Sequence, residues 1–130
     1  NLFMTPESVL EQWAKCFNNG DLNGIKRLYH PDSTLLPTFK PVLMNSTEQI
    51  SGYFAAAIDG KASIEFNVNE SIKKQLSEST YLMTGSYIFC LPAKGGEEYR
   101  SWYSFIVDTS KDSPILHHHS SRVPFDFDLS

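Results

Sequence analysis

The hydrophobic pattern of the chain changes its period once, near residue 62. Before that point apolar side chains recur every three or four residues, which is typical of one face of a helix. After it they alternate with polar side chains, as in the stretch IEFNV at 64–68, which is typical of a strand with one buried face. We therefore predict helices first and a curved antiparallel meander second, an α+β fold in a single domain over residues 1–130.

Three helices are predicted in the amino-terminal half. The first begins at Thr5-Pro6-Glu7, where a hydroxyl can cap free amides and proline costs no hydrogen bond, and it ends at Asn18-Asn19-Gly20. A second, shorter helix follows Asp21 and ends at His30-Pro31, because the residue before a proline disfavours the helical conformation. A third helix is capped at Ser46, and its apolar face carries Ile50, Tyr53, Phe54 and Ile58.

Strands dominate the second half of the chain. Alternating patterns at 81–89 and 99–107 predict two long strands that are separated by a turn at Gly95-Gly96, and Thr34-Leu35-Leu36 predicts a short strand earlier in the chain. Gly85 lies inside the first long strand, where glycine indicates a bulge or a bend that curls the sheet. A curled sheet with helices on its concave side leaves a conical space, which becomes a ligand pocket if side chains do not fill it.

Composition excludes several classes of partner. The formal net charge is −4 and the 11 basic residues are scattered, so we expect no surface that binds nucleic acid. No apolar run approaches the ~20 residues that a membrane-spanning helix requires, so we expect no membrane partner. The sequence indicates no cofactor. Because the chain begins with Asn1-Leu2-Phe3, a cytoplasmic protein and one that has lost a signal peptide both stay open.

Several stretches together carry a resemblance to a known family. They are FNNGDLNGIKRLYHPDSTLLPTF at 17–39, ISGYF at 50–54 and ILHHHSSRVP at 115–124. With Trp13 they resemble the SnoaL-like branch of the NTF2-like superfamily, specifically its SgcJ/EcaC group, which is similar to the association domain of calcium/calmodulin-dependent protein kinase II. The resemblance covers nearly the whole chain. It implies a cone-shaped NTF2-like (cystatin-like) fold, a homodimer formed through the outer face of the sheet, and a pocket.

The resemblance leaves the function open, because relatives include enzymes, assembly domains and proteins of unknown function. We expect an uncharacterised domain that binds a small molecule in the conical pocket and dimerises. One alternative is an isomerase, dehydratase or cyclase that uses His118 as general acid/base. Another is an oligomeric assembly domain like that of the kinase. The His–Asp pair of the SnoaL cyclases has no clear counterpart here, and Arg100 is the counterpart of a pocket arginine in the association domain.

The three consecutive histidines at 117–119 divide between the two faces of the last strand, since successive side chains of a strand point to opposite faces. By comparison with the association domain, five side chains are expected to line the pocket: Arg100, Trp102, Ser104, His118 and Ser120. There His118 can act as acid or base, Ser120 can orient it, and Arg100 can hold a carboxylate. Alternatively, His118 is a hydrogen-bonded core residue and Arg100 is a charge at the rim.

His117 and His119 share the other face and have the His-x-His spacing with which one strand presents two imidazoles to a metal. Two ligands are too few for a metal site, and the sequence indicates no third one. We therefore predict no metal. We expect instead a polar patch on the outer face of the sheet, where the two copies of a homodimer meet.

Overall fold

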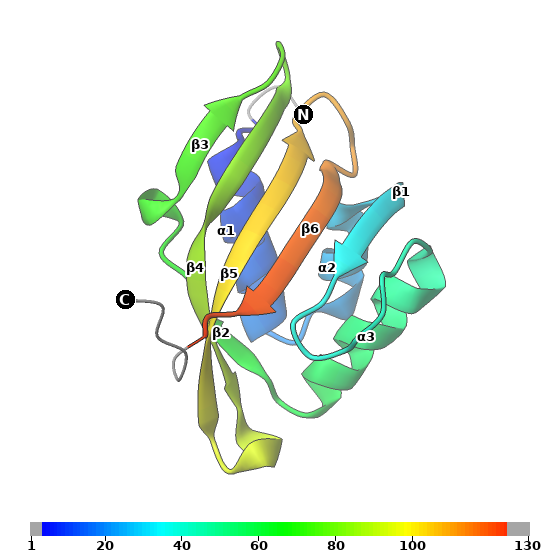
Figure 1. The fold of residues 1–130 in the computed structure, drawn as a ribbon. Coiled ribbons are helices and arrows are strands. Elements are labelled where there is room, and N and C mark those ends of the chain that lie inside the picture. The colour runs from blue at the N-terminus through cyan, green and yellow to red at the C-terminus, as the bar shows by residue number, and fades with distance from the viewer. Residues whose placement is uncertain (1–3, 125–130) are drawn as a thin grey trace.

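The computed structural model describes residues 4–124, in which helices and a six-stranded sheet form two layers (Figure 1). The helices are α1 (Pro6–Asn18), α2 (Leu22–Leu28) and α3 (Thr47–Asp59). The strands are β1 (Tyr29–Leu36), β2 (Ser63–Glu65), β3 (Ile72–Gln75), β4 (Thr80–Leu91), β5 (Glu97–Asp108) and β6 (Ile115–Arg122). The α+β prediction is confirmed. None of the described helices has the length and apolar character that a membrane span needs.

The helices begin at the capping residues that the sequence predicts. The Thr5 hydroxyl accepts a hydrogen bond from the Ser8 amide, and the Ser8 hydroxyl accepts one from the Thr5 amide. Asp21 and Ser46 accept similar bonds from the amide of the third residue in α2 and α3. These bonds satisfy amides that a helix leaves without partners at its start, so the position of each helix is set by its local sequence.

The sheet is a meander with an added parallel edge. The strand order is β1-β6-β5-β4-β2, and β3 pairs with β4 beyond the end of β2. All neighbours are antiparallel except β1 and β6, which are parallel. The predicted antiparallel meander is confirmed for the second half of the chain, and β1 adds a parallel pair that was not predicted. The strand predicted at 34–36 begins at Tyr29, and α2 stops before it. Strand β3 was not predicted because its sequence, IKKQ, is exposed throughout and has no apolar alternation.

Gly85 lies in regular pairing, so the predicted bulge at this position is wrong. A Cβ on Gly85 would lie 2.7 Å from the hydroxyl oxygen of Tyr103, the residue paired with it on β5. Glycine is therefore required because the Tyr103 side chain lies over it. The irregularity lies instead in β6, where an extra residue, Leu116, falls between the partners of Ile106 and Val107.

The core lies between the helices and one face of the sheet, with α1 and α2 behind the strands in Figure 1. At its centre is Trp13 of α1, which is fully buried. Its ring contacts six other rings, those of Phe17, Phe54, Phe66, Tyr87, Phe105 and His118. The space between α1 and the sheet is thus occupied by aromatic side chains, which bury a large apolar area and fix their mutual orientation by edge and face contacts.

Candidate functional site

His118 and Ser120 face the helices, as the resemblance to the association domain implies. In the β5–β6 pairing they lie opposite Phe105 and Tyr103, and both side chains are buried. His118 is 2% exposed, and its ring stacks on that of Phe105 with the ring centroids 3.8 Å apart. The middle histidine is therefore enclosed by the core.

The other three predicted site residues, Arg100, Trp102 and Ser104, lie on the opposite face of the sheet. Trp102 pairs with Ser121 and is 52% exposed, and Ser104 pairs with His119. The prediction that all five side chains line one pocket is corrected, because it placed β5 one residue out of register with β6. A shift of one residue moves a whole strand to the other face. That these three residues contact a ligand stays a prediction, but His118 lies on the other face and would not contact the same ligand.

A chain of hydrogen bonds runs through the buried histidine. The Trp13 indole N–H donates to the Tyr29 hydroxyl over 3.0 Å, and this hydroxyl lies 2.7 Å from Nδ1 of His118. On the other side of the ring, Nε2 lies 2.9 Å from the Tyr87 hydroxyl. Tyr87 in turn donates to Oγ of Ser120 over 2.7 Å. We call this chain of five side chains the relay.

The indole sets the direction of the relay because its N–H can only donate. Tyr29 accepts from Trp13, so its own proton points to Nδ1 of His118, which then accepts. The proton of the neutral imidazole is therefore assigned to Nε2, and it donates to Tyr87. This assignment pairs every polar hydrogen of the relay. A protonated imidazole would place a second donor on Nδ1 against the Tyr29 hydroxyl.

Burial shifts the pKa values of the relay in the direction that keeps it neutral. The pKa of His118 is lowered well below its usual value, mainly because burial penalises the imidazolium and further because His117 and His119 lie nearby. Burial raises the pKa of Tyr29 and of Tyr87 well above the usual value. Since both imidazole nitrogens are hydrogen-bonded, the geometry favours a structural role for His118, and general acid/base catalysis by it stays a prediction.

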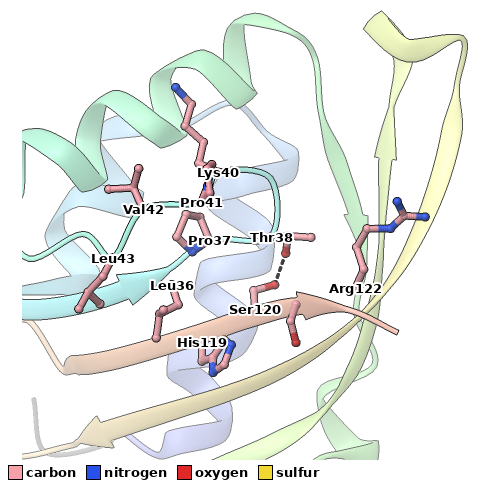
Figure 2. A pocket seen from close by; sticks show the side chains of 11 residues that line it. Leu36, Pro37, Thr38, Lys40, Pro41, Val42, Leu43, His119, Ser120 and Arg122 are labelled. Atoms are coloured by element: carbon pink, nitrogen blue, oxygen red, sulfur yellow. Dashed lines mark hydrogen bonds between the residues drawn. The ribbon is translucent and has the colours of Figure 1, made fainter. Parts of the chain in front are cut away.

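A groove opens beside the carboxyl end of β6 (Figure 2). Its volume is about 430 Å³, and the loop after β1 supplies the apolar side chains of Pro37, Pro41, Val42 and Leu43. Thr38 and Ser120 add polar groups and are hydrogen-bonded to each other, which connects the groove to the relay. Lys40 and Arg122 also line the groove, and Figure 2 shows their side chains directed away from its centre.

The predicted site residues did not include Trp13, Tyr29, Tyr87 or Thr38. Tyr29 falls within the second helix predicted from the sequence, and its position beside β6 depends on a pairing between distant parts of the chain. The sequence did indicate the position of Tyr87, because the alternation along β4 places it on the same buried face as Met83 and Phe89. Thr38 lies in a loop whose path no local pattern predicts.

The outer face of the sheet, which points away from the helices, is not covered by any described helix (Figure 1). Its apolar members are Leu36, Leu82, Ile88, Trp102 and Ile106. His117 and His119 lie on the same face, and Nδ1 of His117 is 2.5 Å from Oγ1 of Thr34 on β1. Within residues 4–124, no three His, Cys, Asp or Glu side chains are grouped so that they could hold a metal ion.

Residues 7–124 match the family described as the calcium/calmodulin dependent protein kinase II association domain. No curated protein matches the chain significantly. A solved structure from Xanthomonas campestris, provisionally assigned as such an association domain, is 28% identical over 90% of this chain and 84% of its own, with a TM-score of 0.78.

Two further solved structures are similar in fold. An uncharacterised protein from Caulobacter vibrioides with a cystatin-like fold is 11% identical over 92% of this chain and 88% of its own, with a TM-score of 0.77. A protein of the NTF2-like family from Streptomyces avermitilis, provisionally assigned as a dehydratase, is 12% identical over 91% and 93%, with a TM-score of 0.77. The NTF2-like, cystatin-like fold expected from the resemblance is thereby confirmed.

We expect the free energy of unfolding to fall as the pH drops below the usual histidine pKa of about 6.5. The folded protein keeps His118 neutral, whereas the unfolded chain takes up a proton there, so this stabilisation is complete above that pH and is lost below it. The slope approaches about 1.4 kcal/mol per pH unit for one histidine, as measured by urea unfolding between about pH 7.5 and 5.5. His118→Gln should flatten the dependence, and equal slopes in both proteins would contradict this account.

Tyr87→Phe removes the central hydroxyl of the relay. It leaves Nε2–H of His118 without its acceptor and Ser120 without its donor. We expect the free energy of unfolding to fall by about 1–3 kcal/mol, the cost of a buried polar group that has lost its partner. The matched control is Tyr99→Phe, whose hydroxyl bonds to Glu97 at an exposed position and should matter by less than about 0.5 kcal/mol. If the free energy of unfolding falls as little in Tyr87→Phe as in Tyr99→Phe, the relay adds little to stability.

Proposed function

The chain belongs to the calcium/calmodulin dependent protein kinase II association domain family, and on this premise we propose that it is a self-association domain. Copies of the chain meet through the outer face of the sheet. The observation that carries the proposal is Trp102, a large aromatic side chain near the middle of that face that is 52% exposed. Tryptophan is among the residues that contribute most to binding energy in protein interfaces.

The outer row of β5 has the polarity of an interface. Charged residues lie at its two ends, Glu98 and Arg100 at one and Asp108 at the other, and Trp102, Ser104 and Ile106 lie between them. Protein interfaces commonly place aromatic and apolar side chains at the centre and charged ones at the rim, where the charges stay hydrated. A second copy that covers the centre of this row would bury Trp102 without burying an unpaired charge.

The outer face is of a suitable size for such a contact. Five strands lie side by side along the path from β1 to β2. Strand β2 has only three residues, so the width is that of β1, β6, β5 and β4. With strands ~4.8 Å apart and ~3.3 Å per residue, eight residues of these four give roughly 14 by 26 Å, or ~370 Å² of flat area. The longer strands β4 and β5, the relief of the side chains and the loop beside β1 add to this area, and stable complexes bury ~800 Å² per partner.

The apolar surface continues past β1. Leu35 forms a bridge to Met44, which holds the preceding loop residues beside the edge of the sheet. Val42 and Leu43 in that loop are 44% and 57% exposed, and Figure 2 shows Leu43 next to Leu36 of the outer face. A partner seated on the outer face would therefore also cover apolar surface at this edge.

The groove beside Ser120 supports a second candidate function, the binding of a small molecule. Its volume of about 430 Å³ lies in the range of ligand sites, which usually combine apolar walls with a few polar groups. The apolar wall suits a compact apolar body, and the hydroxyls of Thr38 and Ser120 suit one hydrogen-bonding group on it. The site differs from the conical pocket expected from the sequence, since it lies between the loop and the end of β6.

Trp102→Glu should weaken self-association at least about tenfold, because it places a charge in the centre of the contact and removes an aromatic anchor. Sedimentation velocity over a series up to about 100 µM measures the effect. Leu76→Glu is the matched control, since Leu76 is 56% exposed but lies in the turn before β4. A wild-type protein that stays monomeric throughout, or equal behaviour of both variants, would reject the proposal.

Benzoate, which has an apolar ring and one oxygen-rich group, is a suitable probe of the groove. Titration followed by amide chemical shifts should move the signals of Thr38, Ser120 and Val42 together. Thr38→Val keeps the shape of the side chain but removes its hydroxyl, and it should weaken binding about three- to tenfold. Shifts that leave these three residues unchanged would exclude the groove as a site for this class of ligand.

A further inference from the structure

We infer that His117 and His119 form one half of a Zn²⁺ site, and that the same two histidines of a second copy complete it. The inference rests on the proposed self-association through the outer face, and it adds a ligand and a means of regulation to that contact. Imidazole nitrogens are good ligands for Zn²⁺, which is held at ~2.0–2.1 Å from each nitrogen.

The two imidazoles stand in one row on an uncovered surface. They are two residues apart on β6, so their Cα atoms are separated by roughly 6.5 Å and both side chains point away from the helices. The residues paired with them on the neighbouring strands are uncharged: Thr34 and Leu36 on β1, and Ile106 and Ser104 on β5. Neither histidine is thus paired with a positively charged residue that would repel a metal ion.

The hydroxyl of Thr34 fixes the ring of His117. Its Oγ1 lies 2.5 Å from Nδ1, and when Nδ1–H donates this bond, Nε2 keeps its lone pair for a metal. Metal-binding histidines usually donate their second ring N–H to an oxygen in this way.

One copy of the chain does not complete the site. Structural zinc sites have four ligands, and residues 4–124 offer no group of three His, Cys, Asp or Glu side chains to one ion. In a two-fold contact each copy presents the same surface to the other. A two-fold axis that passes through the outer face next to His117 and His119 therefore brings the same two histidines of the second copy opposite the first pair. Four imidazoles then surround one ion. Trp102 lies diagonal to His119 across the β5–β6 pairing, so the ion would lie within the contact proposed above.

Sedimentation velocity of the full chain, with EDTA and then with Zn²⁺ at one ion per two chains, tests the inference. Zinc should raise the affinity of self-association at least about tenfold, because an ion held by both copies binds the associated form preferentially. Titration calorimetry should give one Zn²⁺ per two chains. His117→Gln and His119→Gln should each abolish the zinc effect, so that each variant associates with the same affinity in zinc as in EDTA. His30→Gln is the control and should respond to zinc like the wild type, since His30 lies at the start of β1 and Nδ1 accepts from the Asp32 amide.

The comparison of association in EDTA with association in zinc separates this inference from the proposed function. Association in EDTA that depends on Trp102, with no response to zinc, would overturn the metal site and leave the self-association domain standing. Zinc-induced association that survives in both histidine variants, or one ion per chain with no change in mass, would overturn it as well. A chain that is monomeric with and without zinc would reject both. Zinc-dependent association that is lost in His117→Gln and His119→Gln but kept in His30→Gln supports the site.

Discussion

The hydrogen bond from the Trp13 indole to Tyr29 is the contact on which the arrangement of the core depends. It joins α1 to β1, and the relay that it starts continues to His118 on β6 and Tyr87 on β4. Because every member is buried, a missing partner anywhere along this path leaves a polar group without water or protein to bond to. The same tryptophan packs against rings from α3 and the sheet, so the apolar and polar parts of the core share one centre.

The filled core decides which surfaces are left for other molecules. A fold of this type has a concave side that can enclose a ligand. Here aromatic rings and the relay fill the space around Trp13, between α1 and the concave side of the sheet. The contacts proposed for this chain therefore use the outer face and the groove at the end of β6. Ser120 links the core to this groove, because its side chain ends the relay and also lines the groove.

Sequence patterns predicted the parts of the structure that depend on near neighbours. The caps at Thr5, Asp21 and Ser46 located the helices, and alternation predicted the long strands and placed His118 on the face opposite to that of His117 and His119. That His118 points inward came from the resemblance to the association domain. The pairing of β1 with β6 and the register of β5 against β6 escaped prediction, because both depend on contacts between residues far apart in the chain. An error of one residue in that register moved Arg100, Trp102 and Ser104 to the wrong face, so only two of the five predicted site residues lie on the expected face.

The parallel pairing of β1 and β6 also bears on the order in which the protein is made. A ribosome delivers β1 early, but its main partner in the sheet is β6, the last of the strands within residues 4–124. Until β6 emerges, Tyr29 has no histidine to bond to and the nascent chain exposes an unpaired strand edge. Pairing between the first and last strands also gives the fold many long-range contacts, which slow folding. The growing polypeptide therefore exposes this strand edge to chaperones and to aggregation until β6 has been made.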